Sequence, residues 1–206
     1  MITGFLNNAT RRIPPWVIYI LGVAHIVWLV WLAATGGLGV EPINALEKVL
    51  GETGLKMLIV GLMITPLRRF TGINLIRFRR AIGLTAFLYI AAHLTVWLVL
   101  DLQTVMRIWE DILKRPFITI GMIGFSLMIP LAVTSNNWSV RKLGPVWRRM
   151  HKLVYLIALL GAVHFVMLRK GLQIEPLVFL AIVLIVLATR LKLGAMFGRP
   201  KKQSVR

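Results

Sequence analysis

Long runs without a charged side chain constrain this sequence more than any other feature. The stretches at residues 16–35 and 81–100 contain no Asp, Glu, Lys or Arg. Each has about 20 residues, enough for a helix to cross roughly 30 Å of hydrocarbon. Hydrophobic residues make up 58% of the 206 positions and charged residues only 16%, too few for a water-soluble domain of this size. We therefore expect an integral membrane protein.

Further apolar runs predict an all-α fold, a bundle of six transmembrane helices near residues 14–34, 49–67, 81–100, 117–134, 151–168 and 175–192. Three of these spans have short uncharged segments. They reach full length only if Lys56, Lys152 and Arg190 extend their charged ends to the membrane interface. The chain is expected to be a single membrane domain over residues 1–206, with short basic tails at 1–13 and 193–206.

Basic residues are divided unequally between the two sides that six spans define. The N-terminus, the loops at 67–80 and 135–152 and the C-terminal tail hold 18 Lys and Arg and no acid. The other side holds seven basic and seven acidic residues. This is the distribution of the positive-inside rule, so both termini are expected in the cytoplasm. The net charge of +18 then requires no nucleic acid as partner, although the inner face also suits an acidic protein or anionic membrane lipid.

The chain has no cysteine, which excludes disulfides, cysteine nucleophiles, iron–sulfur clusters and thiolate ligation of haem. Almost the only ionisable side chains left inside the spans are histidines. An ionisable side chain inside a membrane is a candidate functional residue. The chain has four histidines: His25, His93, His151 and His164.

Two of these histidines are predicted to lie at one depth. His93 follows Arg80 by 13 residues and His164 follows His151 by 13 residues, on helices that both run outward. At 1.5 Å per residue, each stands about 20 Å from the cytoplasmic edge. Two imidazoles at one depth suit bis-axial ligation of haem iron, with one ring on each face of the macrocycle. The alternative for each is a hydrogen bond between helices.

His151 and His25 have no histidine at their own depth. Arg79 and Arg80 face His151, which could ligate a haem from one side, contact a haem propionate or flavin phosphate, or simply sit at the interface. Thirteen residues at 100° each also place it about 140° around the helix from His164. His25 lies near the middle of the first span, where we expect a hydrogen bond within the bundle.

Several motifs occur in order along the chain: Ile64-Thr65-Pro66-Leu67-Arg68-Arg69, Arg77-Phe78-Arg79-Arg80, Arg115-Pro116-Phe117-Ile118-Thr119-Ile120-Gly121, Pro130-Leu131-Ala132-Val133-Thr134-Ser135 and His151-Lys152-Leu153-Val154-Tyr155. Together with His93 and His164, they resemble the MsrQ (formerly YedZ) family of haem-binding membrane subunits. That family belongs to the wider group with a ferric-reductase-like transmembrane domain, and the resemblance covers about residues 36–195. The wider group has two histidines on each of two helices, whereas here the helix of His93 has one.

The resemblance implies a function in electron transfer rather than catalysis. It implies haem b and FMN as cofactors, in a multi-pass protein of the bacterial inner membrane. Electrons would come from the quinone pool or a cytoplasmic flavin reductase. They would pass to a periplasmic molybdopterin-containing subunit that reduces methionine sulfoxide in oxidised envelope proteins.

For individual residues, the resemblance implies His93, His151 and His164 as ligands of haem iron. The loop arginines best suited to an FMN phosphate or a flavoprotein are Arg77, Arg79, Arg80 and Arg148, which serve equally well as topology determinants. Two alternatives remain open at this point. The first is a stand-alone membrane ferric or quinone reductase with the same haem. The second is a small transporter or structural protein whose histidines only form hydrogen bonds.

Overall fold

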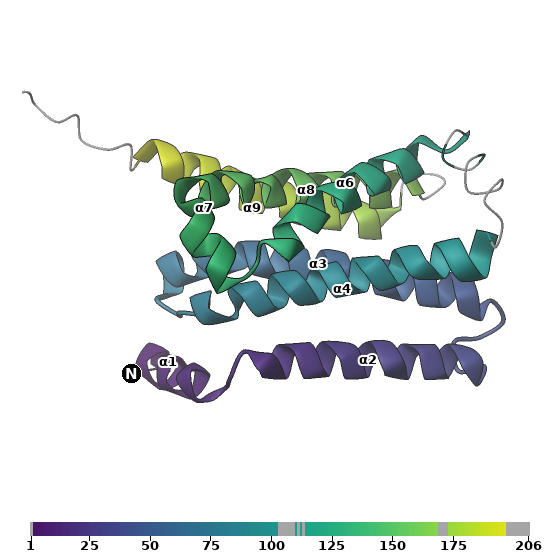
Figure 1. Ribbon diagram of the computed structural model, residues 1–206, viewed down its shortest axis with the longest axis horizontal. Coiled ribbons are helices and arrows are strands. Elements are labelled where there is room, and N and C mark those ends of the chain that lie inside the picture. The colour runs from purple at the N-terminus through teal and green to yellow at the C-terminus, as the bar shows by residue number, and fades with distance from the viewer. Residues whose placement is uncertain (1, 103–109, 111, 113, 169–172, 197–206) are drawn as a thin grey trace, which may run out of the picture.

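The computed structural model describes residues 2–102, 110, 112, 114–168 and 173–196. These residues form helices joined by short turns, and no strand occurs among them. Figure 1 shows three layers of long helices. The first layer is α2 (Trp16–Ala34), the second pairs α3 (Pro42–Thr71) with α4 (Arg79–Val96), and the third contains α6 (Pro116–Val133), α8 (Leu153–Leu168) and α9 (Ile174–Met196). The all-α class is confirmed for the described residues.

Each predicted span overlaps one of these six helices. In the described part of the chain, four segments are long and apolar enough to cross a membrane: α2, α3, α4 with its flanking turns (Ile76–Asp101), and α6. Helix α7 (Asn137–Met150) and α8 meet at a bend of 48° and together satisfy the same criterion as a broken span. The apolar part of α9, Ile174–Thr189, is shorter. The membrane-spanning character is therefore supported, while the number six and the cytoplasmic termini stay predictions.

Helix α3 is longer than its predicted span at 49–67. It has 30 residues, with Pro42 in its first turn, where the missing N–H costs no hydrogen bond. Gly72 ends it in the left-handed conformation, with φ 76°. As a consequence Lys48, just before the predicted span, and Glu52, within it, lie on one continuous helix, although both were counted among the charges of the outer side.

Two further helices, α1 (Ile2–Arg12) and α7, were not among the predicted spans. The Asn7 side chain fixes α1 to the turn between α3 and α4, donating to the Gly72 carbonyl oxygen at 3.1 Å and accepting from the Asn74 N–H at 2.8 Å. Helix α7 begins at the Asn136 cap, whose side chain accepts from the Ser139 N–H at 2.8 Å. Both helices therefore have defined local anchors.

The segments predicted to face the cytoplasm lie together at one end of the bundle. Figure 1 shows α1, the turn between α3 and α4, and α7 at this end, and the turn after α2 at the other. This is the grouping that the charge pattern predicts, although it does not identify which end is cytoplasmic. Some residues that contribute to the pattern lie outside the described residues: Arg107, Asp111, Arg169, Lys170, Arg199, Lys201, Lys202 and Arg206.

The second and third layers meet along α3 and α8. Leu55, Ile59 and Leu62 of α3 pack in one cluster with Ala158 and Ala162 of α8, both of which are fully buried. Small side chains allow two membrane helices to approach closely. This contact brings the helix of His164 against the α3–α4 pair.

Candidate functional site

His93 of α4 and His164 of α8 face each other across the two main layers. Their ring centroids lie 6.4 Å apart, and the ring planes are nearly perpendicular, at 82°. Both line a cavity of about 260 Å³ whose walls come from α3, α4, α6 and α8. The structure thus brings together the two histidines that the sequence placed at one depth.

Each of these histidines is held by a backbone carbonyl of a neighbouring helix. His93 Nδ1 lies 2.9 Å from the Glu47 carbonyl oxygen, and His164 Nδ1 lies 2.7 Å from that of Phe117. A carbonyl oxygen only accepts hydrogen bonds, so both Nδ1 atoms carry the proton and donate it. Each Nε2 is left with a free lone pair, which is the arrangement of a metal-binding imidazole.

A glycine makes each of these contacts possible. In an α-helix the carbonyl of residue i lies beside residue i+4, which here is Gly51 for Glu47 and Gly121 for Phe117. A Cβ on Gly51 would lie 3.1 Å from His93 Nδ1, and one on Gly121 would lie 2.9 Å from His164 Nδ1. Both distances are shorter than ordinary contacts, so a side chain at either position would force the imidazole or its neighbours to shift.

Gly51 and Gly121 were not among the residues predicted for the site. The two glycines have one feature in common: each lies in an apolar helix at the same depth as a histidine on the neighbouring helix. That feature can be recognised only when the helix pairs are known. In the structure α3 packs along α4, and α6 packs along α8.

The donor set fits haem iron better than a free metal ion. With a metal–imidazole bond of about 2.0 Å and about 1.1 Å from ring nitrogen to ring centre, one metal between two imidazoles separates their centroids by about 6 Å. The observed 6.4 Å agrees with that separation. No group of three or more His, Cys, Asp or Glu side chains that could hold a metal occurs among the described residues. Two neutral imidazoles therefore suit a metal whose other ligands come from a macrocycle.

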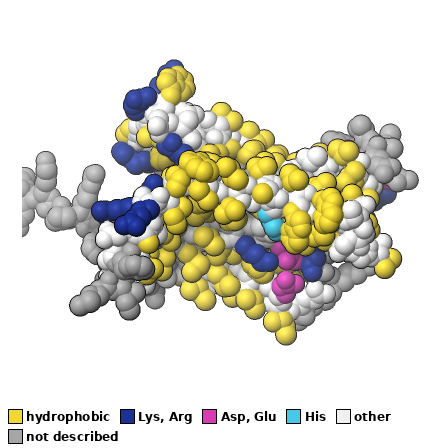
Figure 2. Space-filling view, turned by 90° about the horizontal axis from the view of Figure 1, so that it is seen from below, with side chains coloured by type: hydrophobic (Ala, Val, Ile, Leu, Met, Phe, Trp, Pro, Cys, Tyr) yellow, Lys and Arg dark blue, Asp and Glu magenta, His cyan; other side chains and the backbone are white. Residues whose placement is uncertain are grey.

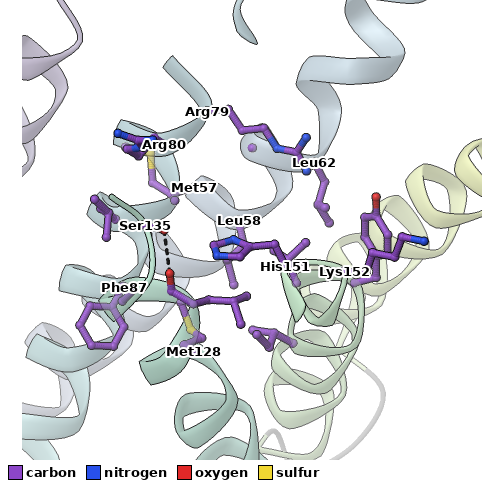
Figure 3. A pocket seen from close by; sticks show the side chains of 18 of the residues that line it. Met57, Leu58, Leu62, Arg79, Arg80, Phe87, Met128, Ser135, His151 and Lys152 are labelled. Carbon is purple, nitrogen blue, oxygen red and sulfur yellow. Dashed lines mark hydrogen bonds between the residues drawn. The ribbon is translucent and has the colours of Figure 1, made fainter. Parts of the chain in front are cut away.

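A second, larger cavity of about 630 Å³ lies nearer the end that holds α1 and α7. The sequence-predicted residues His151, Arg77, Arg79, Arg80 and Arg148 all line it. Figure 3 shows the His151 ring reaching into this cavity, with Arg79 and Arg80 bordering it from the start of α4. The structure therefore brings the predicted basic residues and His151 into one site, separate from the His93–His164 pair.

His151 is held differently from the other two histidines. The Thr134 hydroxyl donates to the Pro130 carbonyl oxygen at 2.6 Å, so it accepts from His151 Nε2 at 3.1 Å. The Trp147 ring stacks on the imidazole, with centroids 3.9 Å apart. In this arrangement Nε2 donates, and no second histidine lines the cavity.

Two of the predicted arginines also have contacts that fix the fold. Arg80 Nη1 donates to Asn137 Oδ1 of α7 at 2.8 Å. Arg77 Nη1 donates to the Thr10 carbonyl oxygen of α1 at 3.2 Å. These contacts tie the surface helices to the start of α4 and hold both side chains at the rim of the cavity.

The two cavities are separated by one layer of side chains. Leu58, Met128 and Ile157 line both of them. Beside this layer, the rings of Phe87 and Phe125 stack with centroids 5.6 Å apart. Cofactors in the two cavities would therefore be close neighbours along the bundle.

His25 belongs to neither cavity. Its Nδ1 lies 2.7 Å from the Tyr89 hydroxyl, which is buried and also donates to the Gly22 carbonyl oxygen at 3.3 Å. The contact joins α2 to α4. The predicted hydrogen bond within the bundle is confirmed.

Comparison with known proteins gives a consistent result. The family model for the ferric reductase like transmembrane component matches residues 50–162. The chain is 48% identical over 190 residues to the protein-methionine-sulfoxide reductase heme-binding subunit MsrQ of Agrobacterium fabrum, covering 90% of this chain and 88% of that protein. It is 49% identical over 177 residues to the proteins of the same name in Brucella ovis and Brucella melitensis, covering 85% of this chain and 80% of each relative. No solved structure matches the chain.

Proposed function

Because the chain belongs to the MsrQ family of haem-binding subunits, within the ferric-reductase-like transmembrane proteins, we propose that it relays electrons across the bacterial inner membrane. The electrons come from quinol or from a cytoplasmic flavin reductase. They leave to a periplasmic molybdopterin-containing subunit that reduces methionine sulfoxide in oxidised envelope proteins. This chain is the electron-transfer subunit, and the chemistry at the sulfoxide belongs to its partner.

His93 and His164 are the residues that would hold the haem through their imidazole Nε2 atoms. A bound b-type haem supplies a one-electron carrier whose iron alternates between the ferric and ferrous states. The protein contributes the Nε2 lone pairs and fixes the imidazole tautomers through the carbonyl oxygens of Glu47 and Phe117. Apolar side chains, including Leu55 and Ile90, line the same cavity and limit access of water to the iron.

The direction of transfer follows from the predicted orientation. If the basic end is cytoplasmic, the His93–His164 pair lies in the outer half of the membrane, where electrons can leave toward the periplasm. The opposite cavity, with His151, then opens toward the cytoplasm.

We assign the cytoplasmic cavity to FMN. Arg79, Arg148 and Lys152 line it and supply the positive charge that a phosphate group requires. His151, stacked on Trp147 and bonded to Thr134, acts there as a polar contact for the flavin site rather than as an iron ligand. One-sided ligation of a second haem by His151 is the alternative, and it requires the imidazole to leave Thr134.

The observation that carries the proposal is the His93–His164 pair, in which both Nδ1 atoms donate hydrogen bonds to backbone carbonyl oxygens. The test is electron delivery by the purified protein, reconstituted in lipid, to its purified periplasmic partner. We expect wild-type protein to re-reduce the partner as it turns over a methionine-sulfoxide peptide, and the His93→Ala/His164→Ala double variant to fail. Equal turnover with the double variant, or reduction of a ferric chelate without transfer to the partner, would contradict the proposal.

A further inference from the structure

Four charged side chains gather on α3 and at the start of α9: Lys48, Glu52, Lys56 and Glu175. Glu52 lies at the centre, with Oε1 3.5 Å from Lys48 Nζ and Oε2 3.5 Å from Lys56 Nζ. Lys48 Nζ also lies 3.9 Å from a carboxylate oxygen of Glu175. Figure 2 shows acidic and basic side chains side by side in the middle of an otherwise hydrophobic face. The bundle therefore carries a charged cluster on a face that should contact lipid.

The depth of this cluster sets it apart from ordinary loop charges. Along α3, Lys56 stands about 18 Å and Glu52 about 24 Å from Arg68 at the basic end of the helix. Both distances are shorter than the roughly 30 Å of the hydrocarbon layer. Glu52 also directly follows Gly51, the residue against which His93 packs. With Arg68 at the basic edge of the membrane, the carboxylate lies within the hydrocarbon layer at the level of the candidate haem, where ionisable groups are costly and are kept for function.

Glu52 forms part of the wall of the candidate haem cavity and has unused hydrogen-bonding capacity. Its side chain is only 10% exposed, whereas Lys48 and Lys56 are 43% and 53% exposed. Its Oε1 is fully buried and accepts no hydrogen bond from the described residues, so Lys48 offers it only an electrostatic partner. The same side chain lines the cavity that His93 and His164 share. A buried acceptor thus lies between the lipid-facing cluster and the electron carrier.

These features define the chemistry of an occupant. It must arrive from the lipid, because Lys48 and Lys56 are exposed along a membrane-spanning helix, with the Phe179 ring 5.7 Å from Lys56 Nζ. It must donate a hydrogen bond, because Glu52 Oε1 is an unused acceptor. It must also be able to give up electrons, because its site shares a wall with the haem ligands. A lipid-soluble hydroquinone meets all three requirements.

We propose that Glu52 marks the site where a lipid-soluble hydroquinone is oxidised, with one quinol hydroxyl donating to Glu52 Oε1. This assignment rests on the proposed haem function of His93 and His164 and names the place where quinol meets it. It also makes the quinol site distinct from the cytoplasmic cavity of His151, so quinol and flavin would reach the same haem from opposite sides.

The reaction at this site balances as follows. Each hydroquinone breaks two O–H bonds, releases two electrons and two protons, and becomes a quinone with two carbonyl groups. A haem held by His93 and His164 would supply the one-electron acceptor for these electrons. Loss of the first electron makes the hydroxyl strongly acidic, so the carboxylate of Glu52 takes its proton even between two lysines. Both protons then leave by way of Glu52 to the outer aqueous phase.

The test is stopped-flow reduction of haem-loaded protein in lipid nanodiscs, with decyl-ubiquinol as one reductant and dithionite as the other. Glu52→Gln keeps the size of the side chain and one acceptor oxygen but cannot take the proton. We expect the limiting rate with decyl-ubiquinol to fall at least about 10-fold, as for loss of a general base. The haem absorbance and the reduction by dithionite should not change.

Glu175→Gln is the matched control, because Glu175 belongs to the same charged cluster but is 48% exposed. It should be reduced by decyl-ubiquinol at the wild-type rate. Glu52→Asp retains a shorter carboxylate and should be reduced by decyl-ubiquinol at an intermediate rate. A wild-type rate of reduction by decyl-ubiquinol in Glu52→Gln would overturn the quinol site. If Glu52→Gln does not retain haem, a wild-type rate in Glu52→Asp would overturn it. Failure of wild-type protein to bind haem would instead overturn the proposed function.

Discussion

The imidazoles of His93 and His164 depend on contacts that only glycine permits. Gly51 and Gly121 each leave room for a histidine to reach the carbonyl oxygen one helical turn earlier. That bond fixes the tautomer and the direction of the free lone pair. The two glycines are therefore as much a part of the candidate site as the ligands, although they touch no cofactor.

We predict that Gly51→Ala and Gly121→Ala each weaken haem binding. The added methyl group would lie 3.1 or 2.9 Å from a histidine Nδ1, so the ring must shift relative to its carbonyl partner. Loss of such a supporting contact typically lowers metal affinity about 10-fold or more. Haem titration of the purified variants measures the effect.

Gly61→Ala serves as the control, because its Cβ would meet Ile82 at an ordinary 3.6 Å on the same helix as Gly51. It should bind haem as tightly as wild type. Unchanged haem affinity in both Gly51→Ala and Gly121→Ala would show that the carbonyl contacts do not support the ligands.

His25 should behave as a structural residue. Replacing it with Ala removes the contact with Tyr89 that joins α2 to α4, which in membrane proteins costs about 1 kcal/mol. We expect a small loss of thermal stability in detergent, with the full haem absorbance retained. Loss of haem from His25→Ala would contradict this structural role.

At the scale of elements, uncharged runs predicted where helices cross the bundle but not where they end. Helix α3 continues past Glu52 and Lys48 to Pro42, because helical hydrogen bonding does not stop where charge begins. Both residues were counted only among the charges of the outer side, so the charged cluster was not predicted. Helix α7 was not predicted because it contains no long uncharged run. Its basic and apolar residues are interspersed over a short segment.

The shape of α7 depends on Gly144, whose φ of 47° and ψ of −114° interrupt the helix. Another residue in this conformation costs about 1–3 kcal/mol. We predict that Gly144→Ala displaces the second half of α7, with Trp147 and His151, and weakens FMN binding measured by flavin fluorescence. Haem absorbance should be retained, since neither haem ligand lies on α7.

The control for that prediction is Gly4→Ala in α1, where a Cβ would meet nothing within 4 Å. It should bind FMN like wild type. FMN affinity that is equal in Gly144→Ala and wild type would argue against a flavin site beside His151.

At the scale of the whole molecule, the equal depth of His93 and His164 could be predicted by counting residues from the basic ends of two helices. The hydrogen-bond partners of these histidines could not be predicted, because the carbonyl oxygens of Glu47 and Phe117 lie on other helices. Only the pairing of helices brings these oxygens close to the imidazoles. Sequence patterns give the position of a residue along its helix, whereas the site depends on which faces of different helices pack together.

The orientation of the bundle is a separate prediction. The charge partition predicts that a reporter fused after Arg206 is cytoplasmic and that one inserted at Gly39 is periplasmic. Alkaline phosphatase, which is active only after export, should be inactive at the first site and active at the second. The reverse pattern would place the His93–His164 pair in the inner half of the membrane and remove the basis for outward transfer.

Haem ligation by His93 and His164 is the central claim, and the most direct measurement combines the absorption and electron paramagnetic resonance spectra of the purified protein. Wild type should contain low-spin haem with two imidazole ligands. His93→Ala and His164→Ala should each lose most of their haem or retain it in a high-spin form, since no cysteine is present to replace the missing ligand. A low-spin spectrum identical to wild type in either variant would contradict the account.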